Sequence, residues 1–431
     1  MKTKTILLYI IAFIFSKQLA AQNSDDVLNL LIKKGVVSQN DADSIRADNA
    51  IKAQEVKPKP KGRVWGQVFT DVIYKDHADS AKRGTGGNLQ YAGQSKDSSA
   101  LDFRRIYLGF DYDFNEKFST EILLAHESGS TDALSGGNRA LYIRAANLRW
   151  KNIYPNADLV IGQTNSPTFS LTTDKIWGYR SVERSISDLR KLGTSNDVGI
   201  LLQGKFNTLG TYGYNLMVGN GTGAKPETDK FKKLYGELYG KFWKDRIFID
   251  AYADYERSSL VARYHQSKTT FKLTLAYQTS IFTTGIEAVE QIQENASRYT
   301  QPKEGGTTIG TIKDTTAAIP FGISYFVRAD VIKNKLSAFL RYDSYNPDKN
   351  FNSKNYYASA VYDGKSTGSI LQTFITGGID YSPSANIHII PNVWYNAYQG
   401  RNDAYQKIKS GSDLTKDYDL VYRVTVSYLF R

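Results

Sequence analysis

Residues 419–430, at the end of the chain, alternate regularly between apolar and mostly polar side chains. Successive side chains of a β-strand point to opposite faces, so this pattern predicts one apolar and one polar face. Similar segments recur along the chain with long polar stretches between them, as in barrels that present one face to lipid. The apolar parity here consists of Leu420, Tyr422, Val424, Val426, Tyr428 and Phe430.

Sixteen such segments predict sixteen strands, and the connections between them alternate in length. Short turns are expected at 115–116, 152–156, 207–209, 243–245, 279–281, 333–334 and 382–385, with long polar segments at 75–100, 128–139, 164–195, 220–232, 257–267, 293–319, 346–369 and 399–418. We therefore predict an all-β fold, a 16-stranded antiparallel transmembrane β-barrel with short periplasmic turns and long external loops. Both termini would then lie in the periplasm. The expected strands lie near 63–74, 101–114, 117–127, 140–151, 157–163, 196–206, 210–219, 233–242, 246–256, 268–278, 282–292, 320–332, 335–345, 370–381, 386–398 and 419–430.

Three regions divide the chain. Residues 1–21 combine an early basic end with a short apolar run, which predicts a secretory signal peptide. Residues 22–62 predict a periplasmic helical lead, with Ser38 and Asp41 forming a capping box, followed by a Pro/Lys linker. Residues 63–431 form the predicted barrel. The absence of cysteine excludes a disulfide scaffold and cysteine chemistry.

The residues that alternate with the apolar row carry many charges of both signs, and their side chains should line the interior of the barrel. Burying so many ions in a dry core would cost a prohibitive amount of free energy, so we expect a water-filled lumen in which they stay hydrated. Twelve acids stand against eight bases in this row, which leaves the preferred ion open. The candidate lumen-facing charges are Arg105, Asp111, Asp113, Glu121, Arg149, Lys205, Asp250, Asp254, Arg328, Arg341, Asp343 and Arg423, together with Asp71, Glu237, Lys241, Glu256, Lys272, Glu287, Asp330 and Asp380.

The long segment 164–195 is the candidate pore constriction because it is rich in basic residues. If it folds into the barrel, its cations would narrow the channel and favour anions, whereas a solvated external loop is the alternative. A helical turn over residues 181–189 would place Arg180 and Arg184 on one face. The candidate constriction residues are Lys175, Arg180, Arg184, Arg190 and Lys191.

Several short segments, in this order, resemble the phosphate-selective porins O and P. They are residues 104–114 (RRIYLGFDYDF), 161–169 (IGQTNSPTF), 179–184 (YRSVER), 196–200 (NDVGI) and 340–343 (LRYD), and the resemblance extends from about residue 62 to the end. The helical lead is similar to one in relatives from Bacteroidetes-like bacteria. The resemblance implies a sixteen-stranded, often trimeric barrel that passes anions such as phosphate.

The predicted function is passive diffusion of small hydrophilic solutes across the outer membrane of a Gram-negative bacterium. The sequence leaves open whether these solutes include anions such as phosphate. The expected partners are outer-membrane lipid, the solute and two further copies in a homotrimer. No cofactor, metal or catalytic residue is expected. Nucleic-acid binding is not expected either, since the excess basic charge is scattered along the chain. Two alternatives remain open. One is a structural or adhesive barrel, and the other is an outer-membrane hydrolase, although His77, His126, His265 and His388 share no motif.

Overall fold

The computed structural model describes residues 24–46, 61–80, 91–127, 131–132, 138–261, 264–302, 309–351, 370–400 and 416–431. The predicted signal peptide and most of the Pro/Lys linker lie outside these residues. The chain divides into two compact units, residues 1–59 and 60–431, and each is described by itself.

The first unit contains two short helices. Helix α2 (Ser24–Lys33) is followed by a helical segment at residues 39–46. Ser38 caps the second helix, because its hydroxyl accepts a hydrogen bond from the amide of Asp41 at 3.2 Å and donates to the Asp41 carboxylate at 2.6 Å. The cap supplies an acceptor for an amide that has no partner within the helix. No helix among the described residues is long and apolar enough to cross a membrane.

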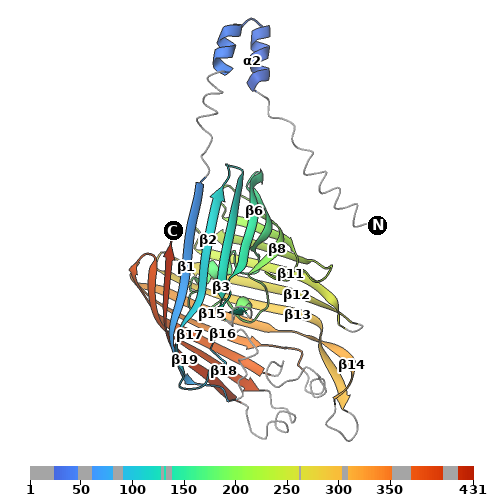
Figure 1. Cartoon of the computed structure of the whole chain (residues 1–431), viewed down its shortest axis with the longest axis vertical. Helices are drawn as coiled ribbons and strands as arrows, with labels where there is room; N and C mark the ends of the chain where they lie inside the picture. Colours follow the sequence, from blue (N-terminus) through green and yellow to red (C-terminus); the bar gives the residue numbers. More distant parts are fainter. Residues whose placement is uncertain are drawn as a thin grey trace. The chain divides into compact units, whose positions relative to one another are not determined.

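The second unit is a closed antiparallel β-barrel of sixteen strands (Figure 1). The last strand pairs with the first, from Gly66 opposite Phe430 to His77 opposite Leu420, and this pairing closes the ring. The sixteen strands predicted from the sequence are all present. They are β1 (Lys61–His77), β2 (Ser99–Asp113), β3 (Phe118–Glu127), β6 (Tyr142–Tyr154), β7 (Ala157–Asn165), β8 (Asn196–Lys205), β9 (Tyr212–Gly219), β10 (Lys233–Phe242), β11 (Ile247–Val261), β12 (Tyr264–Gln278), β13 (Phe282–Pro302), β15 (Phe321–Ile332), β16 (Leu336–Asn346), β17 (Ile370–Ser384), β18 (Ile387–Gly400) and β19 (Lys416–Phe430).

Three additional strands lie within segments that were expected to be loops. β14 (Ile309–Ala318) pairs only with the far end of β13, so this hairpin extends beyond the ring. β4 (Thr131–Asp132) and β5 (Asn138–Arg139) form a separate short pair. The expected loop at 257–267 is largely strand as well, because β11 and β12 continue through most of it. Adjacent strands of a hairpin go on pairing wherever their backbone groups stay in register.

The apolar parity faces outward along the whole barrel. In β19, Tyr422 and Val424 are 47% and 37% exposed, whereas Arg423 and Thr425 are 3% and 0% exposed. Several aromatic side chains near the short turns also face outward, as the interfacial girdle of a barrel requires. Phe248, close to the short turn at 243–245, instead points inward and is 4% exposed. It stands on the parity opposite Ile247 and Ile249. The exposed girdle aromatics include Phe114, Tyr154, Phe206, Phe242, Trp243, Tyr381 and Phe430.

A charge on the outward face should destabilise the barrel in a bilayer. Leu340 is 52% exposed in the middle of β16, so Leu340→Arg would place a guanidinium in hydrocarbon at a cost of about 2–4 kcal/mol. The unfolding free energy in lipid vesicles, measured by urea titration, should fall by that amount. The matched control is Leu209→Arg, because Leu209 lies in the turn between β8 and β9 and should change stability little. Equal losses in both variants would contradict a lipid-facing outer wall.

Candidate functional site

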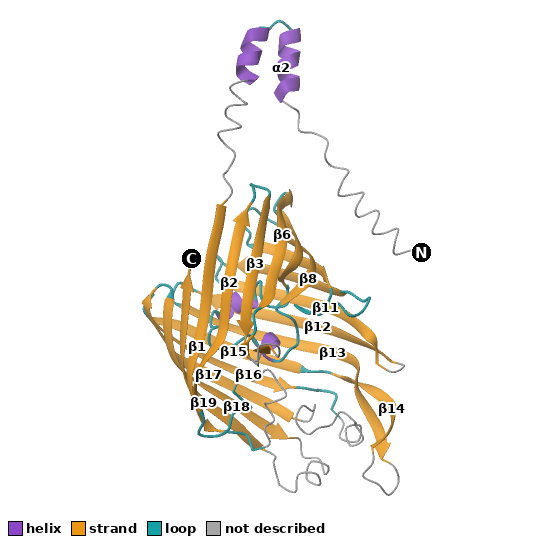
Figure 2. Ribbon diagram, viewed as in Figure 1, coloured by secondary structure: helices purple, strands orange, loops and turns teal. Residues whose placement is uncertain are grey.

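The segment between β7 and β8 lies inside the barrel. It contains two short helices, α4 (Thr173–Trp177) and α5 (Ile186–Leu189), which Figure 2 shows within the ring of strands. Trp177 packs edge-on against Phe326 of β15 and Phe339 of β16, with ring centroids 5.4 and 6.1 Å apart. Its relative exposure is 1%. The apolar residues of this segment therefore form a small core with inward aromatics of the wall, and we call residues 166–195 the inner loop.

Polar contacts fix the inner loop to several strands. The hydroxyl of Thr172 lies 2.6 Å from a carboxylate oxygen of Glu237 of β10 and 2.8 Å from one of Asp250 of β11, within hydrogen-bond distance of both. Arg190 donates to Gln372 of β17 at 2.6 Å and to Asn396 of β18 at 3.2 Å. Ser187 donates to Glu287 of β13. The inner loop thus bonds to a large part of the wall, which restrains it much more than a solvated loop.

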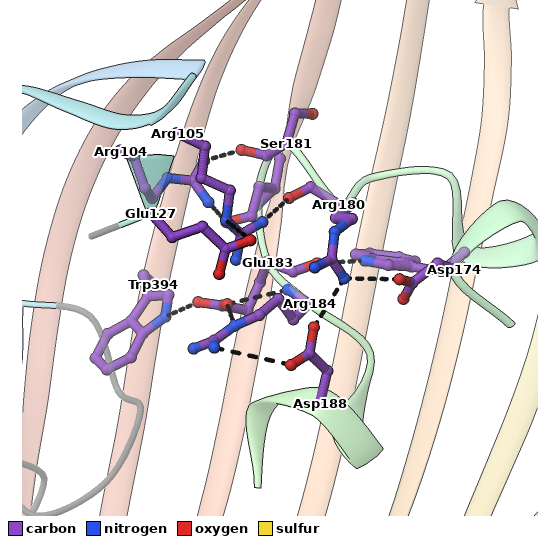
Figure 3. Close-up of polar contacts among 12 residues, drawn as sticks. Arg104, Arg105, Glu127, Asp174, Arg180, Ser181, Glu183, Arg184, Asp188 and Trp394 are labelled. Atoms are coloured by element: carbon purple, nitrogen blue, oxygen red, sulfur yellow. Dashed lines mark hydrogen bonds and ion pairs between the residues drawn. The ribbon is translucent and has the colours of Figure 1, made fainter. Parts of the chain in front are cut away.

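Glu183 is the centre of the polar contacts between the inner loop and the wall (Figure 3). Its carboxylate accepts a hydrogen bond from the indole of Trp394 at 3.1 Å, and its carbonyl accepts one from Trp177 at 2.8 Å. Burial would raise the pKa of Glu183, but the guanidinium groups of Arg184, Arg423 and Arg104 outweigh that effect and lower its pKa to about 2. Glu183 therefore stays ionised and compensates buried positive charge.

Arginines from the wall hold the backbone of the inner loop around Glu183. Arg104 donates to the carbonyls of Ser181 and Val182, and Arg423 donates to the carbonyl of Val182 at 3.1 Å. Arg341 donates to the carbonyl of Arg184 in the same way. Charged donors make strong hydrogen bonds to a buried carbonyl. The backbone of residues 181–184 is thereby held by side chains from three strands.

Two of the inward arginines were not among the sequence candidates, and β-bulges explain both. The register between β1 and β2 shifts next to Arg104, and that between β3 and β6 shifts next to Arg144. An extra residue in one strand changes which parity faces inward. Arg104 and Arg105 are therefore both buried inside, at 1% and 4% exposure, and Arg144 also points inward. The adjacent arginines at 104 and 105 were the only sign of the first bulge in the sequence. Strict alternation of inward and outward side chains assigned only Arg105 to the lumen.

The five candidate constriction residues have different environments. Arg180 forms ion pairs with Asp174 at 2.6 Å and Asp188 at 2.8 Å, and Arg184 approaches Asp188 at 3.9 Å. The helix expected over residues 181–189 is only Ile186–Leu189, because residues 181–184 instead bond to the wall. Arg190 is half-buried, and its guanidinium lies 5.0 Å from the ring centroid of Tyr345.

Lys175 and Lys191 are the exposed members of this set. Partial burial, Arg184 and Lys225 lower the pKa of Lys191. Burial is the larger cause of the lowered pKa, and the two neighbouring cations add to it because like charges disfavour the protonated form.

The candidate lumen-facing charges differ strongly in exposure. At the level of the inner loop, Asp250, Arg341 and Asp343 are 0–1% exposed and form ion pairs, so the expectation that a wet lumen would hydrate the whole row is wrong there. The inner loop covers them, and opposite charges replace water. Also buried are Arg105, Asp254 and Arg423; Asp111, Glu121, Arg149 and Arg328 are intermediate; Asp113 and Lys205, near the short turns, are exposed.

Charges around the inner loop are divided between opposite arcs of the wall. One arc, β19 to β6, contributes four arginines, one lysine and three acids. The other, β10 to β13, contributes four acids and two lysines. Three strands separate the arcs on one side and four on the other. This arrangement creates an electric field across the lumen. The first arc holds Arg104, Arg105, Arg144, Arg423, Lys75, Asp71, Asp419 and Glu127, and the second holds Glu237, Asp250, Asp254, Glu287, Lys233 and Lys272.

Comparisons with solved structures find barrels of low sequence identity. The outer membrane channel DcaP of Acinetobacter baumannii matches with a TM-score of 0.58 and 14% identity, over 87% of this chain and 99% of that one. An anion-selective porin from Comamonas acidovorans matches with a TM-score of 0.53 and 10% identity, over 86% and 100% of the two chains.

The trimer form of OmpT, an outer membrane protein of Vibrio cholerae, matches with a TM-score of 0.50 and 10% identity, over 86% and 100%. No protein-family model and no curated protein matches the chain. At these identities the likeness concerns the fold, and that fold is the barrel of outer-membrane channels.

Proposed function

We propose that this chain is a porin in the outer membrane of a Gram-negative bacterium, through which small hydrophilic solutes diffuse passively. The observation that carries the proposal is a closed barrel with an apolar outer wall and a charged inner wall, narrowed by a loop folded inside. Permeation requires no chemical step, and we propose no enzymatic activity. In support, the four histidines lie on four different strands, namely β1, β3, β12 and β18.

We propose that the inner loop is a fixed constriction and that its exposed lysines favour anions, with phosphate as one such solute. Lys175 and Lys191 are exposed cations, whereas Arg180 and Arg184 are already paired with acids. An unpaired cation contributes more to the potential felt by a passing ion than a cation neutralised by a neighbour. The four acids on the opposite arc of the wall are buried, which supports assigning selectivity to the loop.

We further propose that the protein forms a homotrimer with both termini of the barrel in the periplasm. The first residue of β1 and the last of β19 lie at the end of the barrel that carries the short turns, since Lys61 pairs with Asp113 and Gly66 with Phe430. Outer-membrane barrels keep their short turns on the periplasmic side. The trimer form of OmpT is a structural precedent for assembly of this fold.

Conductance tests the proposed function directly. The purified full chain, added at low concentration to a planar bilayer, should produce discrete steps of current from inserted channels. Protein that enters the bilayer, as shown by protease protection, but carries no current would contradict the porin proposal and leave a structural barrel.

Neutralising the exposed loop lysines should reduce anion preference. In a tenfold salt gradient, the reversal potential of Lys175→Gln/Lys191→Gln should shift toward the value of a cation-selective channel. The reason is that two exposed positive charges are removed from the constriction. The control is Lys349→Gln, which removes a lysine paired with Glu290 at 2.5 Å outside the inner loop. A reversal potential that stays at the wild-type value in the double lysine variant would exclude the loop as the selectivity element.

Removing the charge of Glu183 should release the inner loop. Glu183→Gln retains the shape of the side chain but leaves buried guanidinium groups uncompensated, which costs about 3–5 kcal/mol for a buried pair. Trypsin should then cleave after Arg180 or Arg184 at least about tenfold faster in detergent. Glu227→Gln is the control, because Glu227 forms a surface pair with Lys232 at 2.8 Å. Equal protease resistance in wild type and Glu183→Gln would show that this carboxylate does not hold the loop.

Acid should release the inner loop only at low pH. The folded pKa of Glu183 is about 2 and its ordinary value is 4.5, so its stabilising effect is fully present above pH 4.5 and is lost as the pH falls toward 2. Tryptophan fluorescence should report this change, because Trp177 and Trp394 both bond to Glu183. We expect a constant spectrum from pH 7 to pH 5 and a shift below pH 4 that Glu183→Gln lacks. A shift already complete at pH 5 would contradict the depressed pKa.

A further inference from the structure

A shallow apolar groove of about 810 Å³ lies on the outward face of the barrel, across β9 to β13 and the start of β15. Small residues line its floor, namely Gly236, Ala251 and Ala253, and large apolar side chains rise beside them. Of these, Leu216, Leu238 and Phe271 are 49%, 58% and 50% exposed. The volume is in the range of sites that bind small molecules.

The register of the strands explains the depression. Gly236 of β10 lies between Leu216 of β9 and Ala253 of β11, and Ala253 in turn lies beside Phe271 of β12. Two small residues are therefore neighbours between two large ones in a row across the wall. Closer to the short turns, Ala251 likewise lies between Leu238 and Leu273. The small residues thus form a continuous floor that runs along the strands.

Gly236 is not required by its neighbours among the described residues. A methyl group there would have its nearest heavy atoms at 3.8 and 3.9 Å, which is ordinary van der Waals contact. By contrast, a methyl group at Gly66 would overlap the ring of Phe430, and one at Gly109 would overlap Trp65. Glycine weakens a strand, so a strand glycine with open space beside it indicates close approach by a group from outside.

Positive charge lies beyond the groove, at the end remote from the short turns. Arg257 is on the same outward parity of β11 as Ala253, four residues or about 14 Å farther along the strand. Its guanidinium lies 5.1 Å from the ring centroid of Phe231, and the ammonium of Lys230 lies 5.7 Å from the same centroid. Neither cation has an acidic partner among the residues that the structure describes.

The opposite side of the groove carries a neutral pair. Lys349 pairs with Glu290 at 2.5 Å, and its ammonium lies 5.0 Å from the ring centroid of Phe321. Both Glu290 and Phe321 line the groove. The excess positive charge at this edge therefore belongs to Arg257 and Lys230. An apolar groove with basic groups at one end fits an anionic amphiphile.

We propose that the groove binds an acyl chain of a phosphorylated lipid of the external leaflet, whose headgroup phosphate contacts Arg257 and Lys230. The chain gains carbon contacts on a concave floor that a flat wall does not offer. Charged donors form strong hydrogen bonds with phosphate oxygens, and the spacing along β11 separates the headgroup from the floor. The site rests on the proposed outer-membrane location with periplasmic short turns, but lipid binding does not depend on conduction.

Native mass spectrometry of the full chain, released from detergent, tests the groove with bisphosphorylated lipid A as the probe. Wild type should retain one lipid per barrel. Ala253→Leu fills the floor and should weaken retention at least about fivefold, because the chain loses close carbon contacts. Gly236→Leu should act in the same direction, since the space beside Gly236 is open. The matched control is Ala338→Leu, the same change on β16 outside the groove.

The two cations are tested by their preference for phosphate. Wild type should bind bisphosphorylated lipid A at least about tenfold more tightly than the dephosphorylated lipid. Lys230→Gln/Arg257→Gln should bind both lipids alike. The control is Lys232→Gln, because Lys232 is nearby and pairs with Glu227 at 2.8 Å. The same loss of preference in Lys232→Gln would indicate diffuse attraction to positive charge and would overturn the assignment of the headgroup site.

The same spectra report the number of copies in the assembly. If Ala253→Leu changes the oligomeric state while lipid retention stays at the wild-type level, the groove is a contact between copies of this chain and the lipid site is wrong. Equal lipid retention in Ala253→Leu and Ala338→Leu would also overturn it. Unchanged far-ultraviolet circular dichroism verifies that each variant is folded.

Planar-bilayer recordings separate this proposal from the porin function. Protein that conducts, but retains lipid A regardless of the groove and cation substitutions, would refute the lipid site and leave the porin standing. Protein that does not conduct, yet loses lipid A in Ala253→Leu, would refute the porin and leave the lipid site.

Discussion

The structure depends on the requirement that every backbone amide and carbonyl in a lipid environment find a partner within the protein. A sheet meets this requirement only when its two edges pair, and here β19 pairs with β1 along most of its length. Closure fixes the two faces of every strand at once. The outward parity must then be apolar, and the inward parity is free to carry charge, as Tyr422 and Arg423 illustrate on adjacent positions.

Closing sixteen strands leaves an interior too wide for wall side chains to fill. The inner loop occupies much of that space, and charge compensation around Glu183 holds it there. The wall contributes Arg104, Arg341 and Arg423 as donors to loop carbonyls, while Trp177 adds apolar contact with Phe326 and Phe339. Burying these ions is tolerable because each faces an opposite charge or a carbonyl. The same contacts leave Lys175 and Lys191 exposed.

Different levels of the lumen therefore have different electrostatic character. Around the inner loop, arginines of β19 to β6 face acids of β10 to β13, and most of these charges are paired. Beyond the loop, Arg328 lines a polar cavity, and its Nε atom has no hydrogen-bond partner among the residues that the structure describes.

The sequence by itself determined the barrel. Period-two alternation and alternating loop lengths are local signals, and they predicted the sixteen strands and the outward face. Only the tertiary structure decided which charges meet. Bulges turned Arg104 and Arg144 inward against the alternation, and the docking of the inner loop neutralised Arg180. These outcomes depend on contacts between residues far apart in the chain, and no local pattern encodes the register shifts or the loop path that create them.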